Sequence, residues 1–414
     1  MTDIDWTGGH NDSPSSAQLR SAVRAFAETA VLEPARRYDA AGVFHADIYD
    51  ALRKSPFPAA CFPPELGGTD GSTKALIVVL EELGRADIST AVTFATTVEL
   101  AAGAVLLGGT PEQRATWIPP VIAGEQIASY AIAEQSSGSD VKALETVARR
   151  VGASWVLDGS KKYVTNVIPH LPGYVVIVAK LESAGRDAPL GAFVVPYNTP
   201  GLEVSAPHDK MSWRGTVLVD LVLRDCELPE DAYLGGGAVP WTSGVSRVFE
   251  LGRTGMAAIA LGSSERLLQE SLDHAADRVQ FGKSLDSFQS TRMRLAEMCT
   301  DIAAARLLVY RAAELRDELL MGRYGFEHGI DTPAQRTYSS LAHVAKLFTS
   351  EVTGRVADAA VQILGGKGLT EESDVGRFYR DQRMFRIGQG TTEIEKLIIA
   401  RALLGSRVET AAQS

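Results

Sequence analysis

Three segments of this 414-residue chain have residue types that could bind a ligand, two of them through its phosphate groups. Arg278 begins the run Arg-Val-Gln-Phe-Gly, in which the guanidinium offers a planar fork to phosphate oxygens and Gly282 permits a tight turn. The glycines at 365–366 carry no side chains, so a phosphate could approach their backbone N–H groups. Residues 134–140, Glu-Gln-Ser-Ser-Gly-Ser-Asp, form a polar loop relaxed by a glycine. Together these segments predict a site for a phosphate-bearing ligand.

Few residues could transfer a proton in such a site. Glu99 is the single carboxylate in the apolar run 91–109, and this pattern favours a helix-surface glutamate. If Glu99 instead faced a pocket, it could pair with a substrate amine or act as a base. Glu250 is a second candidate. Gln389 lies between two glycines, and its amide has no usable basicity at neutral pH. The sequence therefore indicates a ligand site more clearly than it indicates a base.

The elements that position these residues divide the chain into three parts. From 17 to 126, apolar residues recur at helical spacings, and one helical run stops at Gly108-Gly109. From 127 to 240, short β-branched runs broken by Gly, Pro, Asn and Asp indicate a mostly antiparallel β domain. From 241 to 414 the helical period returns, with 321–335 expected as a loop. We therefore expect an α+β fold with a β domain between two helical domains.

The composition is that of an ordinary globular protein, with 45% hydrophobic and 22% charged residues. A formal net charge of −10 argues against nucleic acid or an anionic membrane as the main partner. The three cysteines and seven histidines lack metal-site spacing, so no metal is expected, and reduced thiols fit a cytoplasmic location. Residues 7–16 resemble a frayed leader rather than a signal peptide. No run of about 18 apolar residues is evident, so no membrane span is expected.

The segment 362–401 contains a glycine-rich turn, a Tyr-Arg-Asp box and, at 390–394, Gly-Thr-Thr-Glu-Ile. It resembles the C-terminal signature of the acyl-CoA dehydrogenases. Residues 130–140 resemble the flavin loop of that family, and residues 161–166, Lys-Lys-Tyr-Val-Thr-Asn, resemble its next flavin contact. The likeness covers nearly the whole chain. It implies an N-terminal helical domain, a central antiparallel β domain and a C-terminal four-helix bundle.

The resemblance implies FAD as the cofactor. In the family, an aromatic residue lies against the flavin and a threonine hydroxyl lies at N5, and Tyr163 and Thr165 match these positions. Two positions depart from the pattern, because Ala133 stands where threonine is common and Gln135 where proline is common. The FAD-binding residues implied in this way are Tyr130, Ile132, Ala133, Ser139, Tyr163, Thr165, Arg278, Phe281, Gln289, Gln362, Gly365, Gly366, Thr391 and Glu393.

The same resemblance implies an acyl thioester substrate. Its implied contacts are Ser139, Arg253, Gly390 and Arg401. Many members have a glutamate at the position of Gln389, which takes the substrate α-proton. Isovaleryl-type relatives have it immediately before the arginine, where this chain has Gly252. Both base positions therefore lack a carboxylate, and Glu250 lies two residues from the second one, about 200° around the helix.

Three functions stay open on this scaffold. The first is FAD-dependent α,β-dehydrogenation of an acyl thioester, with hydride transfer to flavin N5 and a non-standard base. The second is a flavin enzyme of another class, which suits the amide of Gln389. It would be a monooxygenase or N-hydroxylase, or would perform redox-neutral carbanion or elimination chemistry on a thioester. The third is a non-catalytic FAD-binding subunit.

The family pattern also implies a cofactor shared between chains. It places the Arg278 segment and Gly365-Gly366 on different subunits, so we expect a homodimer or a homotetramer. The thioester could be carried by CoA or by an acyl carrier protein. CoA is favoured, because an acidic enzyme gains no obvious attraction from an acidic carrier protein. The sequence leaves the electron acceptor and the acyl group open.

Overall fold

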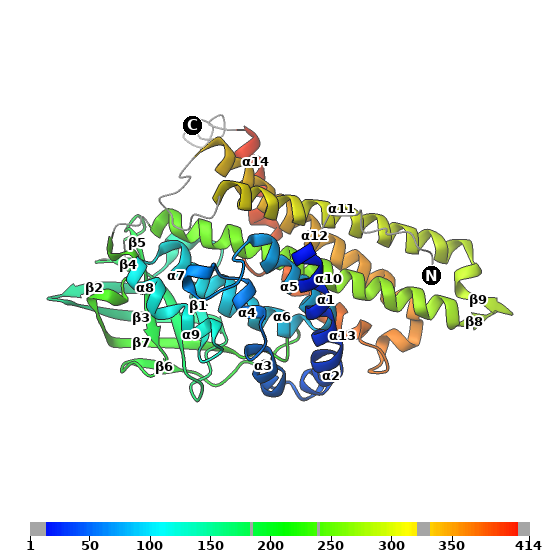
Figure 1. Ribbon diagram of the computed structural model, residues 1–414, viewed down its shortest axis with the longest axis horizontal. Coiled ribbons are helices and arrows are strands. Elements are labelled where there is room, and N and C mark those ends of the chain that lie inside the picture. The colour runs from blue at the N-terminus through cyan, green and yellow to red at the C-terminus, as the bar shows by residue number, and fades with distance from the viewer. Residues whose placement is uncertain (1–13, 183–184, 238–240, 321–331, 405–414) are drawn as a thin grey trace.

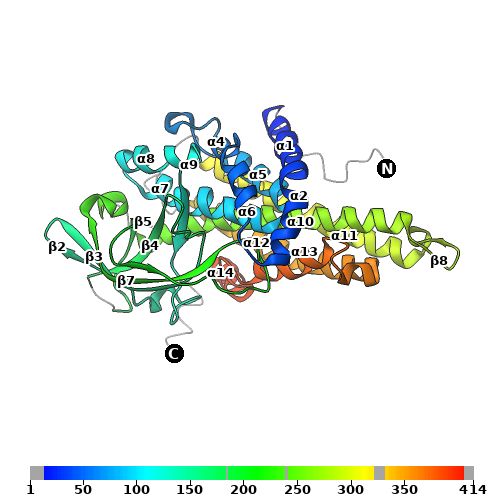
Figure 2. The same ribbon diagram turned by 90° about the horizontal axis from the view of Figure 1, so that it is seen from below.

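The molecule has the predicted α+β architecture, with strands at one end and long helices running to the other (Figure 1). The computed structural model describes residues 14–182, 185–237, 241–320 and 332–404. The long helices are α10 (Trp241–Asp277), α11 (Gln289–Leu320) and α12 (Pro333–Leu364). Seen from below, the N-terminal helices lie across these three (Figure 2). The sheet and the far end of the long helices are thus well separated within one chain.

The N-terminal part is built from helices, as predicted. They are α1 (Pro14–Phe26), α2 (Leu32–Ala41), α3 (Ala46–Arg53), α4 (Phe57–Ala60), α5 (Thr73–Ala86), α6 (Ile88–Ala95), α7 (Ala102–Gly108), α8 (Pro111–Trp117) and α9 (Pro119–Ile122). Helix α1 includes residues 14–16, so the expected leader was placed too far into the chain. The side chains of Ser72 and Asp87 cap α5 and α6. Gly109 follows α7, which confirms the predicted stop.

The segment Ile88–Gly108 runs through α6, a π-helical turn (Thr96–Ala101) and α7. It has 21 residues and a mean hydropathy of 1.6, so by length and composition it could cross a membrane. The expectation that no such run exists was therefore wrong, because threonines and Glu99 interrupt the apolar pattern without ending the helix. The whole of its apolar window is buried inside the protein, as in a core helix.

The β domain is one seven-stranded sheet in the order β1-β4-β2-β3-β7-β6, with β5 paired to β4. The strands are β1 (Ile127–Ala131), β2 (Val147–Val151), β3 (Ser154–Thr165), β4 (Gly173–Leu181), β5 (Leu190–Pro196), β6 (Leu202–Val204) and β7 (Leu218–Pro229). Most pairs are antiparallel, as predicted. The exceptions are β1 and β2, which both pair with β4 in parallel. Parallel neighbours need a long connection, and the chain supplies one in each case: β2 and β3 come between β1 and β4 in the sequence, and β3 comes between β2 and β4.

The end of β3 is irregular where it approaches the helices. Its register with β7 shifts between Lys161 and Val164, and Tyr163 and Asn166 have positive φ values of 60° and 73°. The side-chain amide of Asn166 donates to the carbonyl of Thr93 at 2.9 Å, in the helical run that contains Glu99. Bulges of this kind redirect side chains, so this segment joins the sheet to the helical core.

The C-terminal part consists of α10, α11, α12, the short helix α13 (Val375–Asp381) and α14 (Thr392–Leu404). A two-stranded hairpin, β8 (Val279–Gln280) and β9 (Lys283–Ser284), joins α10 to α11. Helices α11 and α14 both pack against α12, which accords with the predicted bundle. Because α11 reverses the chain, α10 and α12 end on the same side of the molecule (Figure 1). Residues 321–331 of the expected loop lie outside the described residues, and α12 begins at Pro333.

Candidate active site

A buried ion pair anchors the predicted flavin loop. Lys161 Nζ lies 2.5 Å from Glu134 Oε1, and the two side chains are only 0% and 3% exposed. Glu134 also accepts hydrogen bonds from the backbone N–H groups of Glu145 and Thr146, at 2.6 and 3.1 Å. Burial lowers the pKa of Lys161 to about 8, whereas the Lys161 charge and these N–H groups hold the pKa of Glu134 below its usual value despite burial. The pair therefore fastens both ends of the loop to β3.

Next to this loop, Tyr163 presents an open aromatic ring. Its side chain is 59% exposed, and its positive φ is uncommon for a bulky residue. Its backbone N–H donates to Asp220 Oδ1 at 3.1 Å, which holds the unusual conformation. On β1, Tyr130 packs edge-on against Phe249 at 5.9 Å, and its buried hydroxyl has no hydrogen-bond partner in the structure. An exposed ring and a free hydroxyl suit a planar, polar ligand.

The other residues implied for the flavin loop differ in exposure. Ile132, Ala133 and Thr165 are half-buried, and Ser139 is exposed. The carbonyl of Ala133 accepts a hydrogen bond from the Lys162 N–H at 2.8 Å. The backbone at Ala133 is therefore held in place although the threonine hydroxyl common in the family is absent.

The predicted phosphate-binding residues lie at the opposite end of the molecule (Figure 1). At the tip of the β8–β9 hairpin, Phe281 and Gly282 have φ values of 50° and 76°, which is the two-residue turn typical of tight hairpins. The Phe281 side chain is 94% exposed. A Cβ atom placed on Gly282, Gly365 or Gly366 would meet no atom within 4 Å. The backbone at all three glycines is thus open to a ligand.

The Arg278 segment and the Gly365-Gly366 turn lie near each other at one end of the chain. The expectation that they reach one FAD from different subunits stays a prediction. The two elements lie close together because α10 and α12 end on the same side of the molecule. His274, near the end of α10, lies close to both elements. Burial and the charges of Lys367 and Arg278 together hold its pKa below the usual value. A single chain therefore offers both elements side by side, far from its own flavin loop (Figure 1).

Replacing Arg278 with alanine is expected to weaken retention of FAD by about 10- to 100-fold, because it removes a charge-assisted phosphate contact. Arg278 is exposed at the end of α10, so folding should be unaffected. Flavin absorbance per chain after gel filtration measures the effect, with Arg294→Ala on the exposed face of α11 as the control. Equal FAD content in both variants would count against the role assigned to Arg278.

Gln389 occupies a tight turn that aims its amide at α10. Gln389 and Gly390 have φ values of 54° and 104°. The Gln389 side-chain oxygen is buried without a hydrogen-bond partner, and it lies 2.2 Å from where a Cβ of Gly252 would be. The same Cβ would meet Leu100 at 2.7 Å. Gly252 therefore leaves the space into which the Gln389 amide fits, so the two base positions expected from the family lie against each other.

A buried charge network holds the Gln389 turn, and sequence reasoning missed it. Glu395 Oε1 lies 2.9 Å from Arg253 Nε, and Glu395 Oε2 lies 2.5 Å from His343 Nδ1. The Lys346 ammonium donates to the carbonyl of Gly390, and burial lowers its pKa to about 8. His343 and Lys346 lie three residues apart on α12, so helical spacing was the one available signal. Arg253, expected at the substrate, is only 6% exposed and pairs internally with Glu395.

Glu250 faces α12 rather than the Gly252 position. Its carboxylate accepts hydrogen bonds from Gln335 Nε2 at 2.9 Å and from Ser339 Oγ at 2.8 Å. Burial raises the pKa of Glu250 above its usual value. These hydrogen bonds connect α10 to α12. This structural role accounts for a glutamate at position 250 without requiring it to act as a base.

Glu99 is buried, which overturns the expectation of a helix-surface glutamate. It is 1% exposed, and neither carboxylate oxygen has a hydrogen-bond partner in the structure. Its Oε1 lies 2.0 Å from where a Cβ of Gly255 would be, so the carboxyl group fills the space beside that glycine. Burial raises the pKa of Glu99 well above its usual value, and the charge of Arg316 and the nearby backbone N–H of Gly255 oppose this rise only in part.

The remaining predicted site residues lie at or near the surface. Gln289, Gln362, Glu393 and Arg401 are exposed, and Gly390 and Thr391 are half-buried. The Thr391 hydroxyl accepts a hydrogen bond from the Ile394 N–H at 3.3 Å, at the start of α14. Gln289 is the first residue of α11, and Gln362 lies near the end of α12. Both are therefore at the end of the molecule that carries Arg278. The structure thus divides the predicted residues between its two ends.

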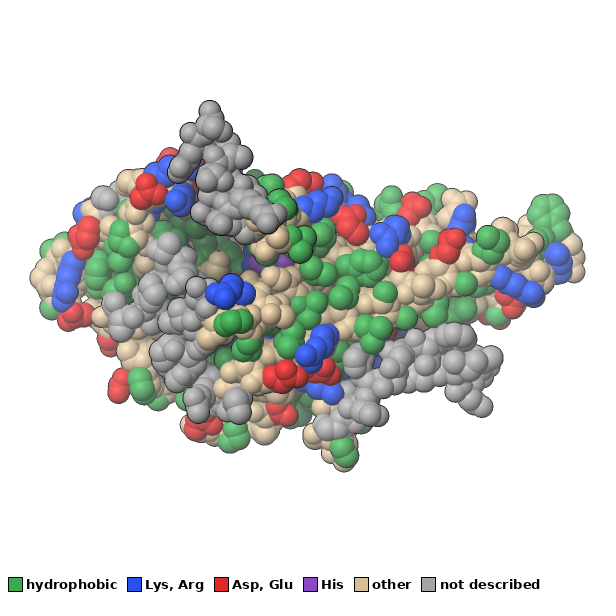
Figure 3. All heavy atoms as spheres, turned by 90° about the horizontal axis from the view of Figure 1, so that it is seen from above, with side chains coloured by type: hydrophobic (Ala, Val, Ile, Leu, Met, Phe, Trp, Pro, Cys, Tyr) green, Lys and Arg blue, Asp and Glu red, His purple; other side chains and the backbone are tan. Residues whose placement is uncertain are grey.

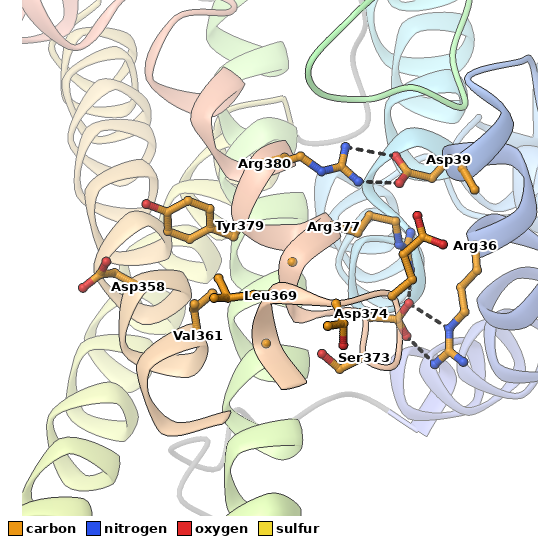
Figure 4. Close-up of a pocket in the computed structure, with 15 residues that line it drawn as sticks. Arg36, Asp39, Asp358, Val361, Leu369, Ser373, Asp374, Arg377, Tyr379 and Arg380 are labelled. Carbon is orange, nitrogen blue, oxygen red and sulfur yellow. Dashed lines mark hydrogen bonds and ion pairs between the residues drawn. The ribbon is translucent and has the colours of Figure 1, made fainter. Parts of the chain in front are cut away.

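A large pocket of about 510 Å³ opens between α2, the end of α12 and α13 (Figure 4). The arginines in its wall are paired with carboxylates. Arg36 binds Asp374 at 2.8 Å, and Arg380 binds Asp39 across the cleft. Neither Gln389 nor Glu99 lines this pocket. It is therefore separate from the site around Gly252.

Two helical parts around a β domain, with an anchored polar loop beside the open Tyr163 ring, fit the class of FAD-binding oxidoreductases. Residues 13–125, 129–226 and 241–404 match the N-terminal, middle and C-terminal domains of acyl-CoA dehydrogenase. The human mitochondrial short-chain specific acyl-CoA dehydrogenase is 33% identical over 388 residues, which cover 94% of this chain and 90% of that protein. This chain belongs to the acyl-CoA dehydrogenase family.

Solved structures agree with this assignment. Butyryl-CoA dehydrogenase from Megasphaera elsdenii has a TM-score of 0.87 and 29% identity, with coverage of 95% of this chain and 99% of that chain. The prolyl acyl carrier protein oxidase AnaB has a TM-score of 0.85 and 26% identity, with the same coverage. Family members bind FAD. The open Tyr163 ring, the free Tyr130 hydroxyl and the uncovered glycine backbones fit that cofactor.

Proposed function

We propose that this protein catalyses FAD-dependent α,β-dehydrogenation of an acyl thioester, with a proton acceptor other than Gln389. The observation that carries the proposal is the position of the Gln389 side chain. Its amide lies buried against Gly252 in a chain that matches the acyl-CoA dehydrogenase family from residue 13 to residue 404. Gln389 therefore stands at the position that the family resemblance assigns to a base, with an amide in place of the carboxylate.

When bound, FAD supplies the hydride acceptor for this reaction. The chain contributes binding and orientation: the Lys161–Glu134 pair holds the flavin loop, and Tyr163 offers its ring. Gln389 can donate a hydrogen bond but cannot accept a proton from carbon at neutral pH. Of the two carboxylates considered as bases, Glu250 accepts hydrogen bonds from side chains of α12, whereas no side chain among the described residues donates a hydrogen bond to Glu99.

A second candidate follows from the amide itself. A flavin enzyme of another class, such as an N-hydroxylase or an enzyme of redox-neutral carbanion chemistry, needs no base at position 389. Anaerobic mixing of the holoenzyme with acyl-CoAs of graded length separates the two candidates. Bleaching of the flavin without oxygen supports dehydrogenation. Turnover that requires reduced flavin together with oxygen supports the second candidate and contradicts the first.

We propose CoA as the thioester carrier. The family model and the human relative are named for acyl-CoA, and a formal net charge of −10 offers no obvious attraction to an acidic carrier protein, although one solved relative is named for a carrier-protein substrate. Parallel titrations with one acyl group on CoA and on a phosphopantetheinyl carrier protein compare the two. The free cysteines accord with a reducing cytoplasm as the proposed location.

We expect a homotetramer made of two dimers, with one FAD per chain. The flavin loop and the phosphate-binding residues lie at opposite ends of one chain, so a single FAD would use residues of two chains. Large apolar side chains also stand exposed among charged ones on the helices (Figure 3). They include Met293, Leu307, Leu397 and Leu403. Light scattering during gel filtration gives the mass, and a monomer with full FAD content would contradict the expectation.

A further inference from the structure

Two unpartnered polar groups lie one turn apart along the same helix. The Gln389 amide oxygen lies against Gly252 of α10, and the Glu99 carboxyl lies against Gly255. Both groups are buried, and none of these three oxygen atoms has a hydrogen-bond partner in the structure. Cβ positions three residues apart on a helix are about 5–6 Å apart, so the two side chains approach within about 10 Å of each other. A buried polar group without a partner is costly, so this pair calls for an explanation.

The backbone around Glu99 is also unusual. Glu99 lies in the π-helical turn Thr96–Ala101, a rare conformation that is frequent at functional sites. Thr97 Oγ1 in this turn donates to the carbonyl of Ala128 on β1, so the turn is fixed to the sheet on one side. On its other side it places Glu99 and Leu100 against α10. The turn therefore holds the carboxyl rigidly beside the Gln389 position.

Among the described residues, no cationic side chain donates a hydrogen bond to the Glu99 carboxyl group. The charge of Arg316 acts on Glu99, but the Arg316 Nη1 group donates to Thr73 Oγ1 at 2.8 Å. Cys61 and Tyr338 lie close enough for the Glu99 charge to act on them: burial raises the pKa of each, and that charge adds to the rise. A carboxyl group in such a place is satisfied best by a ligand that donates a charged hydrogen bond.

We propose that Glu99 is a specificity residue that binds a protonated amine on the acyl group of the substrate. This inference rests on the proposed function, because it places the thioester carbon atoms near Gln389. A group that reaches Gly255 lies one helical turn beyond the Gln389 position, so the amine is separated from the thioester carbonyl by several bonds. Binding the ammonium ion would ionise Glu99 and release its proton to solvent.

The test compares acyl-CoAs in which an ammonium group replaces a terminal methyl group. The pairs are 3-aminopropionyl-CoA against butyryl-CoA and 6-aminohexanoyl-CoA against heptanoyl-CoA. Perturbation of the flavin spectrum of the holoenzyme under anaerobic conditions gives each Kd without requiring turnover. The variants are Glu99→Gln, which keeps the shape, and Glu99→Leu, which makes the site apolar. Glu125→Gln, at an exposed position before β1, is the matched control.

In the wild type, we expect one amine to bind about 10- to 100-fold more tightly than its methyl partner. Glu99→Gln should remove most of that preference, and Glu99→Leu should reverse it, while Glu125→Gln leaves it intact. Equal binding of both members of each pair would overturn the inference, even if butyryl-CoA is dehydrogenated. Conversely, an amine preference without any flavin bleaching would support this inference and overturn the proposed dehydrogenation. A preference that survives Glu99→Gln would assign the amine to another residue and overturn the role of Glu99.

Discussion

Replacing Gln389 with glutamate is expected to raise α,β-dehydrogenation of simple acyl-CoAs by about 10²- to 10⁴-fold, the usual contribution of a general base. The two side chains are nearly isosteric, and the positive φ of position 389 and the space beside Gly252 stay the same. The new carboxylate would lie in a buried site, so its pKa should be raised toward the range useful for a base. Anaerobic flavin bleaching with butyryl-CoA measures the rate.

Gln389→Asp is the matched control, because it introduces the same charge on a side chain one methylene group shorter. We expect a smaller gain from aspartate, since base catalysis depends on reach. FAD content and the thioester-induced spectral change show whether each variant remains intact. If Gln389→Glu binds FAD and thioester yet bleaches no faster than wild type, the pocket is not shaped for this reaction. A flavin enzyme of another class would then be the better proposal.

Replacing Lys161 with methionine is expected to destabilise the protein by about 3–5 kcal/mol, because it leaves Glu134 buried without its partner. The flavin loop should loosen as well, since Glu134 holds the backbone N–H groups of Glu145 and Thr146. Thermal unfolding of the FAD-free protein measures the first effect. The Kd for FAD measures the second.

Lys162→Met is the matched control, because Lys162 is the next residue and bonds Gln135 at the surface. A change there should alter stability by less than about 1 kcal/mol. Adding Glu134→Gln to Lys161→Met should restore part of the loss, since it removes the uncompensated charge. Equal effects of Lys161→Met and Lys162→Met would show that the buried pair does not anchor the loop.

Local patterns in the sequence were sufficient for much of the fold. Helical spacing identified both helical parts, Gly108-Gly109 marked the end of α7, and short β-branched runs identified the strands. These features depend on neighbouring residues, so they can be recognised without a tertiary structure. The motifs around Gln389 and Arg278 were sufficient for the family. Parallel pairing with β4 was missed, because strand direction depends on the path of the whole chain.

Tertiary structure alone decided the environment of each charged side chain. The sequence predicted Glu99 at the surface, but in the structure α10 packs over it. Whether a helix face is exposed or buried depends on what packs against it. The Lys161–Glu134 pair joins residues 27 apart, and the Glu395 network joins three helices. The sequence by itself determined that the chain is a member of this family that lacks a carboxylate at position 389. The environments of Gln389 and Glu99 followed only from the packing of α10, because the glycines at 252 and 255 open space for side chains from distant segments.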